Sequence, residues 1–246
     1  MNGITGHRGE RSELTRGSPS TLSAALARLD DGCCVLVTGD VPDDAYQLAA
    51  SRYFGEPDRE RRRVLALTRG ANDDDAWLPD GVDAADDDAA VIHVDDPARD
   101  PTDVRPGSAD PDSVDLDDSD DTSADELRER LFDAVDRFAD ADGRLELRVG
   151  VYRVDTLCAT LGSDTTRELL RDLASETRDR GGMAHLHLPR SSGDRPRDDP
   201  VVDDVAAALG EHLDVIVELR CRERASGPEE RWHILGWGRT EWNSLR

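Results

Sequence analysis

The sequence contains no lysine: all 31 basic residues are arginine, against 55 aspartate and glutamate residues, so the formal net charge is −24. Positive charge is too scarce for general electrostatic binding to phosphate backbones or to anionic membrane surfaces. The composition therefore excludes this kind of binding to nucleic acid and to membranes. No apolar run approaches the roughly 18 residues of a membrane-spanning helix. Residues 1–16 lack the apolar core of a secretory signal. We therefore expect a cytoplasmic protein.

Cysteine motifs and a serine nucleophile motif are also missing. The four cysteines are Cys33, Cys34, Cys158 and Cys221. They form no C-x-x-C pair, so the sequence predicts neither a zinc ribbon nor a thioredoxin-like redox motif. Cys33 and Cys34 open an apolar run, and we expect them to pack as small hydrophobic side chains. No G-x-S-x-G motif is present to hold a nucleophilic serine.

The excess of acidic residues has a physical interpretation of its own. Self-repulsion at this net charge destabilises a compact state in dilute buffer. In molar salt the Debye length falls to about 3 Å, and the repulsion is screened. Together with the absence of lysine, this composition is typical of proteins from halophiles that accumulate salt. Most of the aspartates are then expected to be hydrated surface carboxylates and not site residues.

Apolar runs alternate with helical patterns along the chain. The runs predict strands over residues 33–38, 62–68, 89–94, 145–154 and 183–188. Helical spacing predicts helices over residues 22–29, 43–54, 124–143, 165–180 and 201–213. Two last runs, 214–222 and 231–237, flank Gly227 and Pro228 and predict a closing β-hairpin. This alternation favours an α/β fold with a mainly parallel sheet.

Two stretches carry too few apolar residues to form a core. Residues 1–17 are expected to be a mobile tail. The stretch at about 95–123 is dominated by Asp, Pro, Ser and Gly, and we expect a disordered acidic insertion within a single domain that spans 18–246. Residues 73–75 and 80–88 are expected to be shorter loops of the same kind. An alternative is that the insertion mimics nucleic acid and binds a basic partner.

The turn after the first strand can be compared with a nucleotide-binding P-loop. There a buried strand ends in G-x-x-x-x-G-K-[ST], whose backbone N–H groups, lysine and hydroxyl hold phosphates and Mg²⁺. The corresponding positions here are Gly39, Asp44, Ala45 and Tyr46. The same turn carries the carboxylates Asp40, Asp43 and Asp44. Like charges 4 Å apart repel by about 1 kcal/mol even in water, so we expect no bound nucleotide. Asp43 or Asp44 is instead expected to cap the following helix.

A second nucleotide motif would be an acid at the end of the strand over 145–154, where it would hold Mg²⁺. Tyr152 occupies that position, and Asp155 is the nearest acid after it. The alternative of an unconventional nucleotide site needs an arginine, such as Arg148 or Arg153, in place of the missing lysine.

Histidine and tryptophan offer two further candidates. His185 and His187 project to one face of a strand and could bind one metal, but spacing supplies no third ligand. We expect a structural pair and no metal, with a metal-dependent enzyme as the alternative. Three tryptophans lie with Arg231 and Arg239 near the C-terminus: Trp232, Trp237 and Trp242. They form either a partner surface or the packing of the hairpin on the sheet, which we favour.

The chain resembles the haloarchaeal branch of KaiC- and GvpD-like RecA-superfamily proteins. The resemblance is carried by residues 35–39, 148–151 with Leu157, 184–189, 214–220 and 231–234. It implies a RecA-like three-layer sandwich, whose active members bind ATP through the P-loop and act as switches. Since this sequence departs from both motifs, the resemblance implies a non-catalytic protein without a cofactor. Such a protein would act in signalling or regulation through an unknown protein partner, as a monomer or homodimer. The alternative is a nucleotide-binding ATPase module with an unconventional site.

Overall fold

The computed structural model describes residues 22–57, 59–68, 74–94, 119–139, 146–190, 199–222 and 227–245. Their strands form one nine-stranded sheet in the order β3-β2-β4-β5-β1-β6-β7-β8, with β9 also paired to β7. The strands are β1 (Cys33–Asp40), β2 (Arg61–Thr68), β3 (Ala89–Val94), β4 (Glu146–Tyr152), β5 (Met183–Pro189), β6 (Val215–Arg220), β7 (Glu229–Ile234), β8 (Gly238–Arg239) and β9 (Asn243–Ser244).

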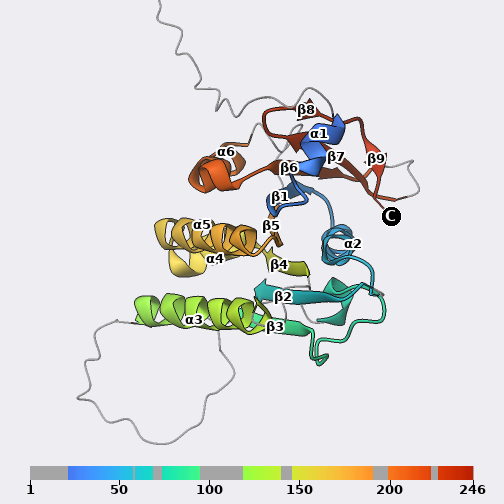
Figure 1. Ribbon diagram of the computed structural model, residues 1–246. Helices are drawn as coiled ribbons and strands as arrows, with labels where there is room; N and C mark the ends of the chain where they lie inside the picture. The colour runs from blue at the N-terminus through green and yellow to red at the C-terminus, as the bar shows by residue number, and fades with distance from the viewer. Residues whose placement is uncertain are drawn as a thin grey trace, which may run out of the picture.

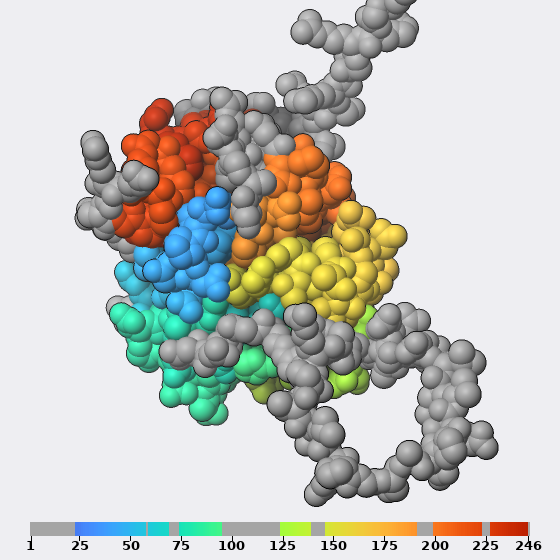
Figure 2. All heavy atoms as spheres, turned by 180° about the vertical axis from the view of Figure 1, so that it is seen from behind, coloured from blue at the N-terminus to red at the C-terminus, as the bar shows by residue number. Residues whose placement is uncertain are grey.

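Helices cover both faces of this sheet (Figure 1). They are α1 (Leu22–Ala27), α2 (Asp43–Phe54), α3 (Ser119–Ala139), α4 (Val154–Leu161), α5 (Ser163–Asp179) and α6 (Pro200–Leu209), with short 3-10 turns η1 (Asp75–Trp77) and η3 (Gly210–His212). One hydrophobic cluster joins α3, α4, α5 and α6 to the sheet, and a second joins α1, α2 and η1 to the other face. In the view from behind, α4, α5 and α6 adjoin as yellow and orange surfaces (Figure 2).

The centre of the sheet is parallel and buried on both faces. In β1, Leu36 packs into the first cluster, whereas Val35 and Val37 pack into the second. β1 pairs in parallel with both β5 and β6, and β6 then pairs antiparallel with β7. The expected three-layer α/β sandwich, with a mainly parallel sheet and a C-terminal hairpin, is confirmed. The hairpin is itself part of the central sheet, because its first strand lies beside β1.

Several expectations need correction or lie outside the described residues. The stretch 80–88 is not a loose acidic loop throughout, because Val82 is buried there. Trp77 and Leu78, between the two expected loops, are buried as well, since α2 and the sheet offer an apolar face for them. Helix α4 was not expected. Helix α3 begins at Ser119, earlier than expected, while residues 95–118 and the tail 1–17 lie outside the described residues. None of the described helices combines the length and apolarity that a membrane crossing requires.

Candidate functional site

The carboxyl edge of β1 is the place where this topology positions a ligand site. The helix that follows β1, α2, packs on one face of the sheet, whereas α6, which follows the neighbouring strand β5, packs on the other. In open α/β sheets, ligands bind in the crevice that opens where connections diverge to opposite faces. The P-loop-like turn and the end of β4 both lie at this edge, so the sequence placed its two nucleotide motifs correctly.

The buried side chain of Tyr46 packs against the turn that follows β1 and binds its backbone. Gly39 lies so close to β6 that a Cβ atom would stand 2.3 Å from the carbonyl oxygen of Leu219, so only glycine fits. The Tyr46 side chain is fully buried, and its hydroxyl donates a 2.8 Å hydrogen bond to the carbonyl oxygen of Gly39. Burial raises the pKa of this phenol, and nearby Tyr152 raises it further. The space beneath the turn is therefore filled by a neutral aromatic side chain.

Tyr152 ties the end of β4 to the start of α2. Its hydroxyl donates a 2.7 Å hydrogen bond to Oδ1 of Asp43. Burial raises the pKa of Tyr152, and the bond to Asp43 adds to this. The expected helix cap is wrong: Pro42 is the N-cap residue of α2 and makes no side-chain cap bond. Asp43 and Asp44 lie instead in the first turn, where the helix dipole favours negative charge.

The residue after Tyr152 has a strained backbone. Arg153 adopts the left-handed conformation, with φ 65° and ψ 67°, and in the described ranges it is the one non-glycine residue with positive φ. Its guanidinium donates a 3.0 Å bond to Asp155 in the first turn of α4. Such strain concentrates at functional sites. Arg148, by contrast, is registered with Met183, the first residue of β5. It therefore lies toward the opposite edge, and the expectation that it could reach a nucleotide is wrong.

The two candidate histidines lie in the core on the α2 side of the sheet. Nδ1 of His185 and Nε2 of His187 share a 2.8 Å hydrogen bond, and both rings are fully buried. Gly150 makes room for them, since a Cβ atom there would lie 2.6 Å from Cε1 of His185. In the described part of the chain, His185 Nε2 and His187 Nδ1 have no hydrogen-bond partner. Burial lowers the pKa of His187 to about 3 and that of His185 well below its ordinary value, so both are neutral.

The histidines do project to one face, as predicted. Among the described residues, however, no group of three or more His, Cys, Asp or Glu side chains could hold a metal ion. The described residues therefore supply no third ligand for the alternative of a metal-dependent enzyme. The imidazoles instead pack in an aromatic cluster, which we define as Tyr46, Trp77, Tyr152, His185 and His187.

Sequence reasoning missed one member of the aromatic cluster, Trp77. Its ring centroid lies 3.9 Å from that of Tyr152, and its side chain is almost fully buried. The available signal was the apolar pair Trp77-Leu78 within an acidic stretch, which is more typical of a buried anchor than of a loose loop.

These residues do not fit the phosphates of a nucleotide. A phosphate-binding turn needs backbone N–H groups directed inward and a cation beside them. Here the carbonyl of Gly39 accepts hydrogen bonds from the Tyr46 hydroxyl and from the backbone N–H of Arg190, which follows β5. The exposed side of the turn carries the carboxylates Asp40 and Asp44, and Arg153 is already paired with Asp155.

The C-terminal tryptophans divide into two groups. Trp232 lies edge-on to Tyr53, and Trp232 and Trp237 both pack partly buried against the cluster on the α2 side. Trp242 instead contacts two guanidinium groups, whose Cζ atoms lie 3.7 Å (Arg220) and 4.4 Å (Arg231) from the ring centroid. The first two therefore pack the hairpin strands against the α2 side of the core, while Trp242 forms a separate half-buried cluster with arginine. The exposed Arg239 lies in β8.

Comparisons with known proteins give a family and solved structures of similar fold. No curated protein matches the chain. Among solved structures it is similar to the KaiC-like protein PH0186 from the hyperthermophilic archaeon Pyrococcus horikoshii OT3, at 12% identity and a TM-score of 0.47 over 82% of this chain and 78% of that chain. The family model described as "Family of unknown function (DUF7504)" matches residues 32–219, and the chain therefore belongs to the DUF7504 family.

Proposed function

We propose that this protein is a non-catalytic RecA/KaiC-like protein with degenerate Walker motifs, which acts in signalling or regulation through protein interaction. The observation that carries the proposal is the buried hydrogen bond from the Tyr46 hydroxyl to the carbonyl of Gly39. It places a phenol and a carbonyl at the turn where a nucleotide-binding protein would present N–H groups and a lysine.

The second motif supports the same proposal. The β4 position that would carry a magnesium-binding acid is a tyrosine bonded to Asp43. Asp155, the next acid, is neutralised by Arg153. An incoming triphosphate would have to displace one of these pairs and also approach the exposed acids of the turn. Each such like-charge contact costs about 1 kcal/mol even in water.

The interaction part of the proposal rests on the C-terminal hairpin. Tryptophan and arginine dominate the binding energy of many protein interfaces. Trp242 and its two arginines combine both, and their orientation is fixed because Glu229 binds Arg220 and Glu218 binds Arg231. We propose a protein partner for this surface, and not nucleic acid or a membrane, since the chain is strongly acidic. A halophilic, cytoplasmic protein that is a monomer or homodimer belongs to the same proposal.

ATP turnover tests the non-catalytic part directly. The assay uses the full chain with MgATP in molar KCl, which screens the self-repulsion of an acidic protein. We expect no phosphate release above the protein-free blank, and the same for Asp155→Ala, which removes the nearest acid after the Tyr152 position. Turnover by the wild-type chain that is lost in Asp155→Ala would contradict the proposal and favour the ATPase alternative.

A further inference from the structure

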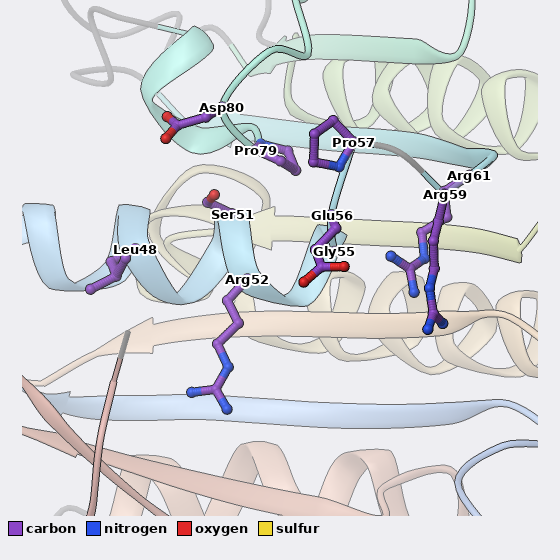
Figure 3. A pocket seen from close by; sticks show the side chains of 10 residues that line it. All are labelled: Leu48, Ser51, Arg52, Gly55, Glu56, Pro57, Arg59, Arg61, Pro79 and Asp80. Carbon is purple, nitrogen blue, oxygen red and sulfur yellow. The ribbon is translucent and has the colours of Figure 1, made fainter.

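A pocket of about 480 Å³ lies far from the P-loop-like turn (Figure 3). It is formed at the amino end of β2, between the C-terminus of α2 and the segment that follows η1. Six of its lining residues are Ser51, Arg52, Gly55, Glu56, Arg59 and Arg61. Its volume is within the range of roughly 300–1,000 Å³ typical of small-molecule sites. The aromatic cluster and the proposed function make no use of this pocket.

Two of the pocket's arginines are held in place by carboxylates outside its lining. Nε of Arg61 donates a 2.8 Å bond to Glu146, and Nη1 of Arg52 donates a 2.6 Å bond to Glu230. A guanidinium has five N–H donors, so one such bond orients the group and leaves further donors for a ligand. Because both carboxylates bind from outside, the arginines are preorganised, which lowers the entropic cost of binding.

The backbone at Gly55 leaves room for the guanidinium group of Arg61. Gly55 has φ 77°, in the left-handed region that favours glycine. A Cβ atom at Gly55 would lie 2.0 Å from Nη1 of Arg61. Glycine is therefore required at this position both by its conformation and by the guanidinium beside it.

Arg59 has no role in holding the described structure together. It is exposed, and no described carboxylate forms an ion pair with its guanidinium. The charge of Arg59 nevertheless affects the carboxyl group of Glu146. Burial raises the pKa of that carboxyl, but the hydrogen bond from Arg61 and the charges of Arg148, Arg61 and Arg59 lower it below its usual value. Three arginines thus act on the one carboxylate of Glu146, and the pocket lining itself holds three arginines against two carboxylates, in a chain whose net charge is −24.

Two carboxylates in the lining restrict where an anion can bind. Glu56 lies beside Gly55, and Asp80 lines the far wall. Figure 3 shows Arg59 and Arg61 extending in the same direction, with Asp80 at the other end of the pocket. A negatively charged ligand group is therefore repelled from the Asp80 end and attracted to the Arg59 end.

We propose that this pocket binds a multivalent oxyanion, a phosphate or a polycarboxylate, through Arg59 and Arg61, with Arg52 as a further donor. Arginine is the side chain best suited to such a ligand, because its planar fork matches carboxylate and phosphate oxygens with paired hydrogen bonds. Phosphate and carboxylate groups share this recognition chemistry, and the experiment separates them.

The test is calorimetric titration of the full chain in molar KCl with inorganic phosphate and, separately, with citrate. We expect saturable binding of at least one of the two, and the one that binds more tightly assigns the ligand group. Arg59→Gln should weaken that binding by at least about tenfold, since a charge-assisted contact is lost. The matched control is Arg28→Gln, an exposed arginine outside the pocket lining, which should bind as the wild type does.

The variant Arg59→Gln separates a loss of ligand binding from a loss of folding. Because this side chain makes no described ion pair, its replacement should leave the thermal unfolding midpoint unchanged, so weaker binding cannot be attributed to misfolding. Two results would overturn the proposal: the absence of saturable binding by both anions, or binding by Arg59→Gln as tight as that of the wild type.

Discussion

Replacing Tyr46 with alanine is expected to lower the free energy of unfolding by about 3–5 kcal/mol, the loss typical of large aromatic residues deleted from a core. The side chain is fully buried and contacts the rings of Tyr152 and His187. Its removal leaves a cavity under the turn that follows β1 and takes away one of the two hydrogen bonds to the carbonyl of Gly39, which keeps the bond from the backbone N–H of Arg190. Chemical denaturation in molar KCl measures the change.

Tyr46→Phe is the matched control. It keeps the ring and removes only the hydroxyl. Its cost should be about 0.5–1.5 kcal/mol, the net contribution of one hydrogen bond, because the carbonyl of Gly39 still accepts the backbone N–H of Arg190. If alanine cost no more than phenylalanine, the ring would not be filling the space beneath the turn, and this account of the site would be wrong.

Acidification from about pH 7.5 to about pH 5 should destabilise the fold through the two core histidines. The pKa of His187 falls to about 3 in the folded state and that of His185 is also strongly lowered, whereas unfolded histidine titrates near 6.5. Below pH 6.5 the unfolded chain thus binds protons that the folded chain does not. Stability then falls with falling pH by about 1.4 kcal/mol per pH unit for each histidine.

The effect at about pH 5 is about 2 kcal/mol for each histidine. This window lies above the ordinary pKa values of Asp and Glu, near 4, so the acidic surface contributes little. Denaturation midpoints measured across the window give the slope. His187→Gln should roughly halve it, whereas His93→Gln, which changes an exposed ring paired with Asp74, serves as the control. A stability that stayed constant across the window would contradict the burial of two neutral imidazoles.

Hydrophobic periodicity predicted most of the fold, because each central strand is buried on both faces and appears as a continuous apolar run. Helix α4 was missed for a physical reason. It begins at Val154, separated from β4 by Arg153 alone, and the chain reverses at this residue in a left-handed conformation. No glycine or proline marks that turn, so the apolar residues of strand and helix form one unbroken pattern.

The site was predicted only in part. Gly39, Tyr46 and Tyr152 were identified because local motifs define them, and the parallel sheet brings them to one edge. The hydrogen bonds at this edge join residues that are far apart in sequence, such as Tyr152 with Asp43. The arginine pocket depends on α2, β2 and the segment after η1 together. No periodicity or spacing signals such contacts, because they depend on how the elements pack.

Equilibrium binding of a fluorescent ATP analogue with Mg²⁺ in molar KCl tests the central claim most directly. It should be measured on the wild type and on Arg59→Gln, so that an anion contact in the arginine pocket is distinguished from binding at the Gly39 turn. We expect no saturable binding to Arg59→Gln up to millimolar nucleotide. Saturable binding that persists in Arg59→Gln and is lost in Asp155→Ala would contradict the account, because it would place a working nucleotide site at the carboxyl edge of β1.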